Sequence, residues 1–470
     1  DPRLKKVIDA VQELEMLLGY DRLDIEFAVD KNEQCFTFQI RPITINHSQF
    51  KLDSKNLSIH LQKAQQEFSA LQEKRNNIFG DYTIFSRMTD WNPAEIIGTK
   101  PNSLAISLYN HLITKNIWAE QRTEFGYRNI CPTPLLYNFC AQPYVDCRAS
   151  INSFIPSELN DDCASRLVNA YLSLLNKNPH LHDKLELEVV FTIWTPTFSK
   201  DAKERFKDQD VSADDLIQLE NALKKITSNA LVRLDKDISS INTLIKNFEK
   251  LIKSDLKPIE KSYQLIEDCR KFGTLAFAHA ARAGFVAVTL FKSLVKLGIL
   301  SQDRMLQFQA SITTVVSDFQ SSLLNNLSFE KLIKKFGHLR PGTYDVNQLA
   351  YWEDPDFYFN TSKLSNLKKE NDVNNFVFDQ RELEGFQHIL NELEARIEVH
   401  DFIKYLEKAI QARESTKFNF TRNLSTALDF MIKYGIEELE LTREEVGYLI
   451  FDDIIALQKK QLNKKKLKDF

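Results

Sequence analysis

The sequence predicts a mainly α-helical protein, in which a large helical domain follows one short helix and one β-hairpin. Two observations support this fold class. Only 12 Gly and 13 Pro occur among the 470 residues, and both residue types interrupt regular helices or mark turns. From about residue 57 onward, apolar residues recur at three- and four-residue spacing, which is the period of an amphipathic helix.

The first elements are a helix and a hairpin. Residues 4–18 carry apolar side chains at helical spacing, and Gly19 is placed to end that helix. Residues 23–30 and 35–41 alternate between apolar and polar side chains and are separated by four polar residues. This pattern predicts a β-hairpin that ends at Pro42.

The remainder of the chain is expected to be helical, with its loops where Gly and Pro cluster. Residues 212–256 predict either two long amphipathic helices or one kinked helix. Further helices are expected at 261–299, 301–336, 379–411 and 421–460, and loops at 92–156 and 337–355. The domains are expected at 1–46, at 47–80 as a linker helix, at 81–458 as the helical domain and at 459–470 as a basic linker.

Charge and cysteine content restrict the possible partners. With 61 Lys and Arg against 65 Asp and Glu, the net charge is −4, so no general attraction to nucleic acid or anionic lipid is expected. No uninterrupted run of about 18 apolar residues is present, so no membrane span is expected. The six Cys show no zinc spacing, and the first residues do not resemble a signal peptide. We expect a cytoplasmic protein with neither nucleic acid nor membrane as a partner.

The hairpin is the segment with the clearest chemistry. A four-residue loop pairs Asp30 with Cys35, which places Glu26 opposite Gln39 and Arg41 one pair further along. A carboxylate and an amide oxygen about 5 Å apart across two strands can share a divalent cation.

A guanidinium next to that pair can hold a phosphate oxygen. The hairpin thus has the groups of a nucleotide–magnesium site. The alternative is a solvated sheet face with a salt bridge between Asp24 and Arg41. In either case the other face, which carries Ile25, Phe27, Val29, Phe36, Phe38 and Ile40, is expected to pack on a core.

The two strands also resemble a known family. Residues 24–30 (DIEFAVD) and 39–44 (QIRPIT) resemble the last hairpin of the ATP-grasp domain of phosphoenolpyruvate synthase and pyruvate phosphate dikinase. The resemblance implies that Glu26 and Gln39 hold Mg²⁺ and that Arg41 contacts the phosphates of ATP. Residues 1–46 would then be the C-terminal end of that domain.

Other segments resemble the helical central domain of the same superfamily. They are residues 88–98, 336–345, 351–355 and 412–418. A helical domain that directly follows ATP-grasp is closest to the domain order of rifampin phosphotransferase, in which it binds the acceptor.

By this resemblance the loop at 336–345 belongs to the acceptor site. His338 is expected to act as general base on an acceptor hydroxyl, with Arg340 steering phosphate. Tyr344 and Asp345 are expected to contact the substrate. The alternative is that this loop only caps a helix and fixes a turn. A capping role is also open for Asn92, Pro93 and Glu95, which have the order of N-cap, N1 and N3 residues.

The family moves a phosphoryl group from ATP through a phosphohistidine on a swivelling domain to an acceptor. The Gly-rich ATP loop and the Thr-Ser-His signature of that relay are not found in this sequence. The expectation is therefore a phosphotransferase part that works with the missing ATP-grasp and phosphohistidine domains, in cis or in trans. The acceptor, whether pyruvate, a sugar or an aromatic compound, stays open. The alternative function is a non-catalytic helical scaffold or regulatory protein.

Overall fold

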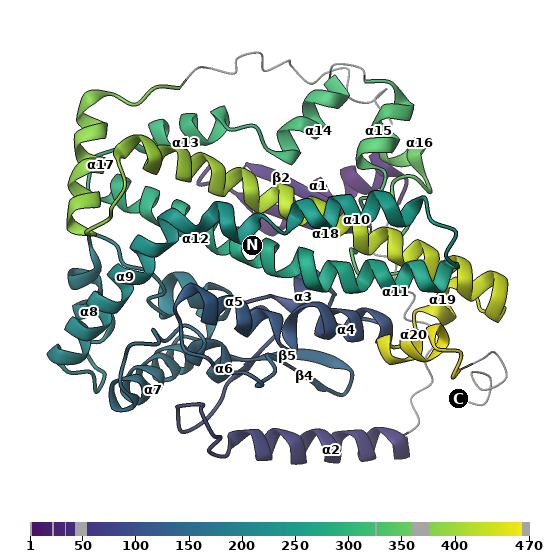
Figure 1. The fold of residues 1–470 in the computed structure, drawn as a ribbon, viewed down its shortest axis with the longest axis horizontal. Helices are drawn as coiled ribbons and strands as arrows, with labels where there is room; N and C mark the ends of the chain where they lie inside the picture. The colour runs from purple at the N-terminus through teal and green to yellow at the C-terminus, as the bar shows by residue number, and fades with distance from the viewer. Residues whose placement is uncertain are drawn as a thin grey trace.

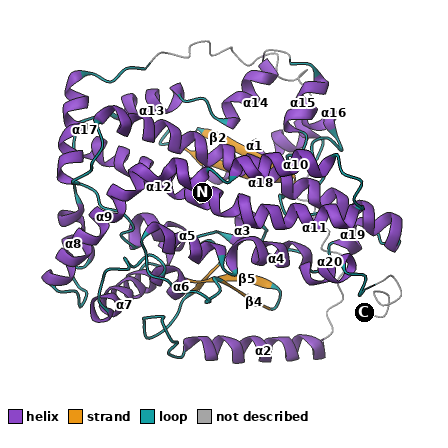
Figure 2. Cartoon of the chain, in the orientation of Figure 1, coloured by secondary structure: helices purple, strands orange, loops and turns teal. Residues whose placement is uncertain are grey.

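The computed structural model describes residues 2–20, 23–32, 34–42, 54–324, 327–359 and 376–462. Helices make up most of it, with one hairpin near the N-terminus and one small sheet (Figures 1 and 2). The predicted fold class, a mainly α protein with an N-terminal hairpin, is confirmed. Residues 47–53 of the predicted linker helix and 463–470 of the predicted basic linker lie outside the described residues.

The N-terminal unit consists of α1 (Pro2–Leu18), β1 (Leu23–Val29) and β2 (Cys35–Pro42). Helix α1 ends where the sequence predicts, because Gly19 adopts a φ of +65°. Its amide donates to the carbonyl of Glu15 over 2.9 Å, which satisfies one of the last helical carbonyls.

The hairpin register is as predicted in one half and shifted in the other. Glu26 lies opposite Gln39, and Asp24 lies opposite Arg41. A bulge after Glu26 shifts the rest by one residue, so the predicted pairing of Asp30 with Cys35 is wrong. The Asp30 carboxylate instead accepts hydrogen bonds from the amides of Asn32 and Gln34, at 2.9 and 2.8 Å. An Asp that binds its own turn in this way leaves the strand ladder.

The expected apolar face of the hairpin is not buried among the described residues. Phe27 is 46% exposed, Phe36 43% and Phe38 71%. The bulge also changes the faces, because Phe36 pairs with Ala28 and so shares the face of Glu26. The prediction that all the aromatic residues pack together on a core is therefore wrong.

A three-stranded antiparallel sheet has two of its strands within the predicted loop region 92–156 and the third before it. Its strands are β3 (Phe85–Ser86), β4 (Leu136–Phe139) and β5 (Gln142–Asp146), in the order β3-β5-β4. The β4–β5 turn is formed by Cys140 and Ala141 with φ of 51° and 60°. Neither residue type favours that backbone region, which is why the sequence did not predict this hairpin.

Among the helices before residue 258, α3 and α6 pack against this sheet through β5. Buried Arg148 holds the end of α2, because its guanidinium donates to the carbonyls of Leu71 (2.5 Å) and Glu73 (3.0 Å). The helices before residue 258 are α2 (Ser54–Gln72), α3 (Pro93–Ile96), α4 (Ser103–Tyr109), η2 (Asn110–Thr114), α5 (Ile117–Phe125), α6 (Cys147–Asn152), α7 (Asp161–Lys177), η3 (Pro179–Lys184), η4 (Leu185–Val189), α8 (Phe198–Arg205), α9 (Ala213–Ile238) and α10 (Ile241–Ile252). The predicted region 212–256 is thus a pair of helices, α9 and α10.

The helices after residue 258 form the centre of the molecule and its C-terminal part. They are α11 (Pro258–Asp268), η5 (Cys269–Thr274), α12 (Leu275–Lys296), α13 (Gln302–Ser311), α14 (Val315–Leu324), α15 (Phe329–Phe336), α16 (Pro355–Tyr358), α17 (Gln380–Glu392), α18 (Val399–Leu439), α19 (Arg443–Val446) and α20 (Phe451–Gln458). The predicted helix 301–336 is therefore three helices.

The predicted break between 411 and 421 is also wrong, because α18 is continuous through it. Thr416 is 1% exposed there, and its hydroxyl donates to the carbonyl of Ala412 over 2.7 Å. Burial of Thr416 against neighbouring helices, together with this hydrogen bond, keeps residues 411–421 helical although Thr has a low intrinsic helix propensity.

The continuous stretch Pro258–Lys296 is, within the part of the chain that the structure describes, the one helix long and apolar enough to cross a membrane. This qualifies the expectation that the chain has no such stretch. Of the 18-residue apolar segment within this helix, 67% is buried inside the protein. Burial of this extent is typical of a core helix.

Helix α18 contributes to both large hydrophobic cores. Its N-terminal half, including Phe402 and Ala409, belongs to the core shared with α7, α9 and α12. Its C-terminal half, including Leu424 and Met431, belongs to the core shared with α4, α11 and α20. Figure 1 shows α12 and α18 running along one another across the molecule. One rigid helix therefore links the two cores.

Shortening a buried side chain of α18 should destabilise the protein. Leu424 is 0% exposed, and Leu424→Ala is expected to lower the free energy of unfolding by about 2–5 kcal/mol. Ile436, which is 49% exposed on the same helix, is the control, since Ile436→Ala should change it by no more than about 0.5 kcal/mol. Urea denaturation measures both, and equal effects would contradict the assigned burial.

Candidate functional site

A cavity of about 620 Å³ lies between the N-terminal hairpin and two loops of the helical domain. Asp24, Glu26 and Arg41 line it from the hairpin. The other lining residues come from segments 88–98 and 341–348 and are Met88, Ala94, Glu95, Ile96, Ile97, Gly98, Pro341, Gly342, Asp345 and Gln348. Three segments that the sequence analysis selected separately thus meet around one space.

Asp24, Glu26 and Arg41 line this cavity from the hairpin, whereas Gln39 is not among its lining residues. One nitrogen of Arg41, Nη2, contacts Oε1 of Glu26 and also Oε1 of Gln39, the latter over 2.9 Å. The ion pair on this face is therefore Glu26–Arg41 and not the Asp24–Arg41 pair of the alternative. Because both oxygens reach the same nitrogen, both are also within reach of a single cation.

Carboxylates dominate the charge of the cavity. Asp24, Glu26, Glu95 and Asp345 line it, and among the described residues Arg41 is the basic side chain that does so. Such a surface attracts cations and repels an uncompensated triphosphate.

These donors fit a magnesium ion only in part. No group of three or more potential metal-ligating His, Cys, Asp or Glu side chains occurs within the described ranges. Mg²⁺, however, is commonly bound by one or two protein oxygens together with water and substrate phosphates. The oxygens of Glu26 and Gln39 meet that requirement.

Loop 88–98 reaches the cavity through a capped helix turn. The side chain of Asn92 accepts from the amide of Glu95 at 3.1 Å and donates to its carboxylate at 2.8 Å. Asn92 thus has the capping role given above as the alternative, and Pro93 follows at N1. Glu95 caps this turn and also lines the cavity.

His338 and Arg340 do not line the cavity, and their predicted catalytic roles are not supported. Arg340 donates to the hydroxyl of Ser425 (3.3 Å), the carbonyl of Gln348 (2.6 Å) and the carboxylate of Asp429 (2.5 Å). Its side chain is 0% exposed, so it has no free face for phosphate. Arg340 instead fixes loop 340–348 to α18, as the structural alternative proposed.

His338 is buried in the same way. It is 2% exposed and lies edge-on to the ring of Phe418 at 4.5 Å. Burial, assisted by the positive charge of Arg422, lowers the pKa of His338 to about 3. A group with that pKa is a weak base at neutral pH.

The two residues predicted to contact substrate have different positions. Tyr344 is 2% exposed and packs edge-on against Tyr109 at 5.4 Å, so it belongs to the core. Asp345 does line the cavity. The side chain of Asn102 and the amide of Asn347 both donate to its Oδ1, at 2.9 and 3.0 Å, which orients its other oxygen without engaging it.

Sequence reasoning missed a buried ion pair that holds loop 88–98. Arg122 makes two hydrogen bonds to Asp90, at 2.8 and 2.5 Å, and their side chains are 3% and 2% exposed. The hydroxyl of Ser150 also donates to Asp90 (2.6 Å), and Arg122 donates to Ser153 (2.5 Å). Bidentate pairing of this kind compensates two buried charges. No spacing in the sequence signals a pair so distant in the chain.

A comparison with protein-family models found no match for this chain, and a search of curated proteins found none either. The resemblance to the phosphoenolpyruvate synthase superfamily stays a hypothesis that rests on the quoted segments.

Burial of neutral His338 should make stability depend on pH. Its folded pKa of about 3 lies below the unfolded value of about 6.5, so the unfolded state binds more protons between these values. The stabilisation is complete above about pH 6.5 and is lost as the pH falls toward 3. We expect the free energy of unfolding to fall between pH 7 and pH 5 by about 2 kcal/mol more in wild type than in His338→Gln. Parallel urea titrations measure the difference, and identical pH slopes would refute the burial of a neutral imidazole.

Removal of the buried charge of Asp90 should be costly. Asp90→Asn leaves Arg122 without its carboxylate and is expected to lower the free energy of unfolding by about 3–5 kcal/mol. Asp161, 77% exposed and paired with Arg128 at 2.7 Å, provides the control. Asp161→Asn should cost no more than about 1 kcal/mol. If thermal denaturation showed the same loss of stability in both variants, the structural role of the buried Asp90–Arg122 pair would be contradicted.

Proposed function

We propose that this chain is the acceptor-binding part of a cytoplasmic, ATP-dependent phosphotransferase of the phosphoenolpyruvate synthase and pyruvate phosphate dikinase superfamily. The observation that carries the proposal is the meeting of the hairpin with segments 88–98 and 341–348 around one cavity. The resemblance identified these segments one by one, and helical periodicity does not require them to be neighbours. Their contact is what a shared site would need.

In this proposal Glu26 and Gln39 hold Mg²⁺ and Arg41 binds a nucleotide phosphate. Bound Mg²⁺ would neutralise phosphate oxygens and the negative charge of the cavity. Arg41 now contacts Glu26 and Gln39, so it would exchange these partners for phosphate when the cation binds. The ion pair thus keeps the two oxygen ligands together in the absence of ligand.

Two carboxylates on the opposite side of the cavity are suited to the acceptor. Asp345 has one oxygen fixed by Asn102 and Asn347, and Glu95 is exposed at the loop. A carboxylate held in this way can accept the proton of an acceptor hydroxyl. The general-base role expected of His338 therefore passes to Asp345 in the proposal.

The second candidate is a scaffold or regulatory protein that binds a cation but transfers no phosphoryl group. The structural use of His338, Arg340 and Tyr344 favours this reading. The acidic lining of the cavity is compatible with it as well, because it needs no triphosphate.

Mn²⁺ binding tests the hairpin site, with protein made from its complete reading frame. We expect Mn²⁺ and a non-hydrolysable ATP analogue to bind together, and Glu26→Gln to raise the Mn²⁺ Kd about tenfold or more through loss of a charged ligand. Electron paramagnetic resonance of free Mn²⁺ gives the Kd. Glu13→Gln, an exposed change on α1, is the control.

The outcomes separate the two candidates. ADP formation that Glu26→Gln abolishes supports the phosphotransferase. Mn²⁺ binding that depends on Glu26 without ADP formation supports the scaffold. Equal Mn²⁺ affinity in wild type and Glu26→Gln would refute the metal site in both.

A further inference from the structure

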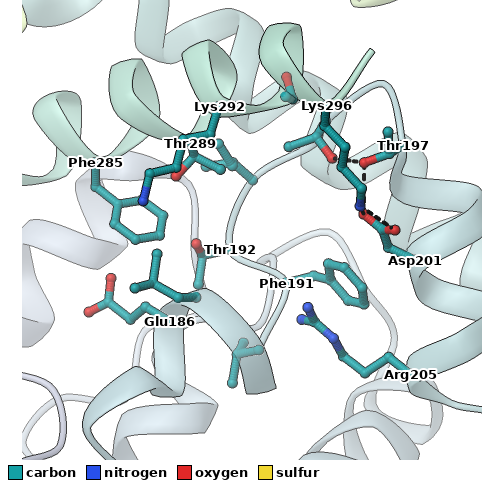
Figure 3. Close-up of a pocket in the computed structure, with 15 residues that line it drawn as sticks. Glu186, Phe191, Thr192, Thr197, Asp201, Arg205, Phe285, Thr289, Lys292 and Lys296 are labelled. Atoms are coloured by element: carbon teal, nitrogen blue, oxygen red, sulfur yellow. Dashed lines mark hydrogen bonds and ion pairs between the residues drawn. The ribbon is translucent and has the colours of Figure 1, made fainter. Parts of the chain in front are cut away.

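A second cavity lies between α12, α8 and the segment 185–197 (Figure 3). Its volume is about 180 Å³, which suits a molecule much smaller than a nucleotide. Its polar lining consists of three basic side chains, five hydroxyls and two carboxylates: Arg205, Lys292, Lys296, Thr192, Thr195, Thr197, Thr289, Ser293, Glu186 and Asp201.

Both carboxylates are already paired. Asp201 binds Lys296 through both of its oxygens at 2.8 Å. Glu186 pairs with Arg282 at 2.8 Å, and Arg122 lies 3.7 Å from it. The two carboxylates are thus neutralised by Lys296 and Arg282. The charges of Arg205 and Lys292 then give the cavity a net positive charge.

The two remaining cations keep donors available. Arg205 makes one hydrogen bond, to the carbonyl of Val189 at 3.3 Å, and its guanidinium lies 3.8 Å from the centre of the Phe191 ring. A guanidinium has five N–H donors, so most of them stay available. Lys292 is paired with no carboxylate among the described residues.

A buried hydroxyl faces the same space. Thr192 is 2% exposed, and its Oγ1 has no hydrogen-bond partner within the described part of the chain. Figure 3 shows this hydroxyl directed into the cavity toward α12. Leaving a buried hydroxyl unpaired is unfavourable by about 1–3 kcal/mol, so a ligand that hydrogen-bonds to Thr192 would remove that cost.

The segment that carries Thr192 is held firmly. The backbone carbonyl of Thr192 accepts a hydrogen bond from the hydroxyl of Tyr127 at 2.5 Å. Two residues later, the amide of Trp194 donates to the hydroxyl of Thr227 at 2.9 Å. Thr192 is therefore positioned before any ligand arrives, which lowers the entropy lost on binding.

We propose that this cavity binds a small oxyanion, a phosphate or carboxylate group, through Lys292, Arg205 and Thr192. Guanidinium, ammonium and hydroxyl donors are the groups that bind such anions, and all three line this one small cavity. The rings of Phe191 and Phe285 also line the cavity and can contact a short apolar part of the ligand. This inference is independent of the proposed function, since it uses neither the hairpin nor the acidic cavity.

Inorganic phosphate is the probe, used with the complete protein at constant ionic strength. Isothermal titration calorimetry should show saturable binding to wild type. Lys292→Met is expected to raise the Kd about tenfold, the loss of one charge-assisted hydrogen bond. Lys200→Met removes the same charge from an exposed position of α8 outside the cavity and should leave the Kd unchanged.

Thr192→Val provides a readout that a purely structural role would not give. Because the hydroxyl has no partner among the residues that the structure describes, the variant should keep or raise the Tm of the anion-free protein while its phosphate Kd rises. Malonate, tested by competition with phosphate, distinguishes a phosphate-selective site from one that accepts any small oxyanion. Absence of saturable binding of either anion, or equal Kd values in wild type and Lys292→Met, would overturn the proposal.

Discussion

Helices α12 and α18 pack closely against one another at Gly284 of α12. A Cβ on Gly284 would lie 3.5 Å from the carbonyl oxygen of Ala409 and 3.3 Å from the side chain of Arg413. Gly284 and Ala409 bring the two backbones close at this point, and α18 contributes to both large cores. Both cavities depend on this pair. Helix α12 forms a wall of the basic cavity, and α18 holds Arg340, which fixes the loop of the acidic one.

Buried arginines hold the loops that the helices leave free. Arg340 fixes loop 340–348, Arg122 fixes loop 88–98 through Asp90, and Arg148 fixes the end of α2. Each guanidinium spans several acceptors at once, and removing it from water is compensated only when those acceptors are fixed. This explains why loops between long helices can present side chains such as Asp345 and Glu95 in fixed positions.

The two cavities have opposite charge. The cavity at the hairpin is lined by four carboxylates and one arginine, and the cavity beside α12 has an excess of positive charge. Fields of opposite sign favour ligands of opposite charge, cations in the first cavity and anions in the second. A protein that brings a metal-bound donor together with an anionic small molecule would need both kinds of site, and so would a regulatory protein that senses the two ligands.

Local periodicity and turn residues were sufficient to predict several elements of the fold. The mainly α fold, the end of α1 at Gly19 and the pairing of Glu26 with Gln39 all follow from periodicity and turn residues. For residues 212–256 the periodicity left open whether there are two helices or one kinked helix. The tertiary structure decided the hairpin bulge, the continuity of α18 through Thr416 and the sheet around β5. It also decided that His338, Arg340 and Tyr344 are buried, while Asp345 and Glu95 face a cavity. Burial and ion pairing depend on residues distant in the chain, such as Asp90 with Arg122, and no local spacing carries that information.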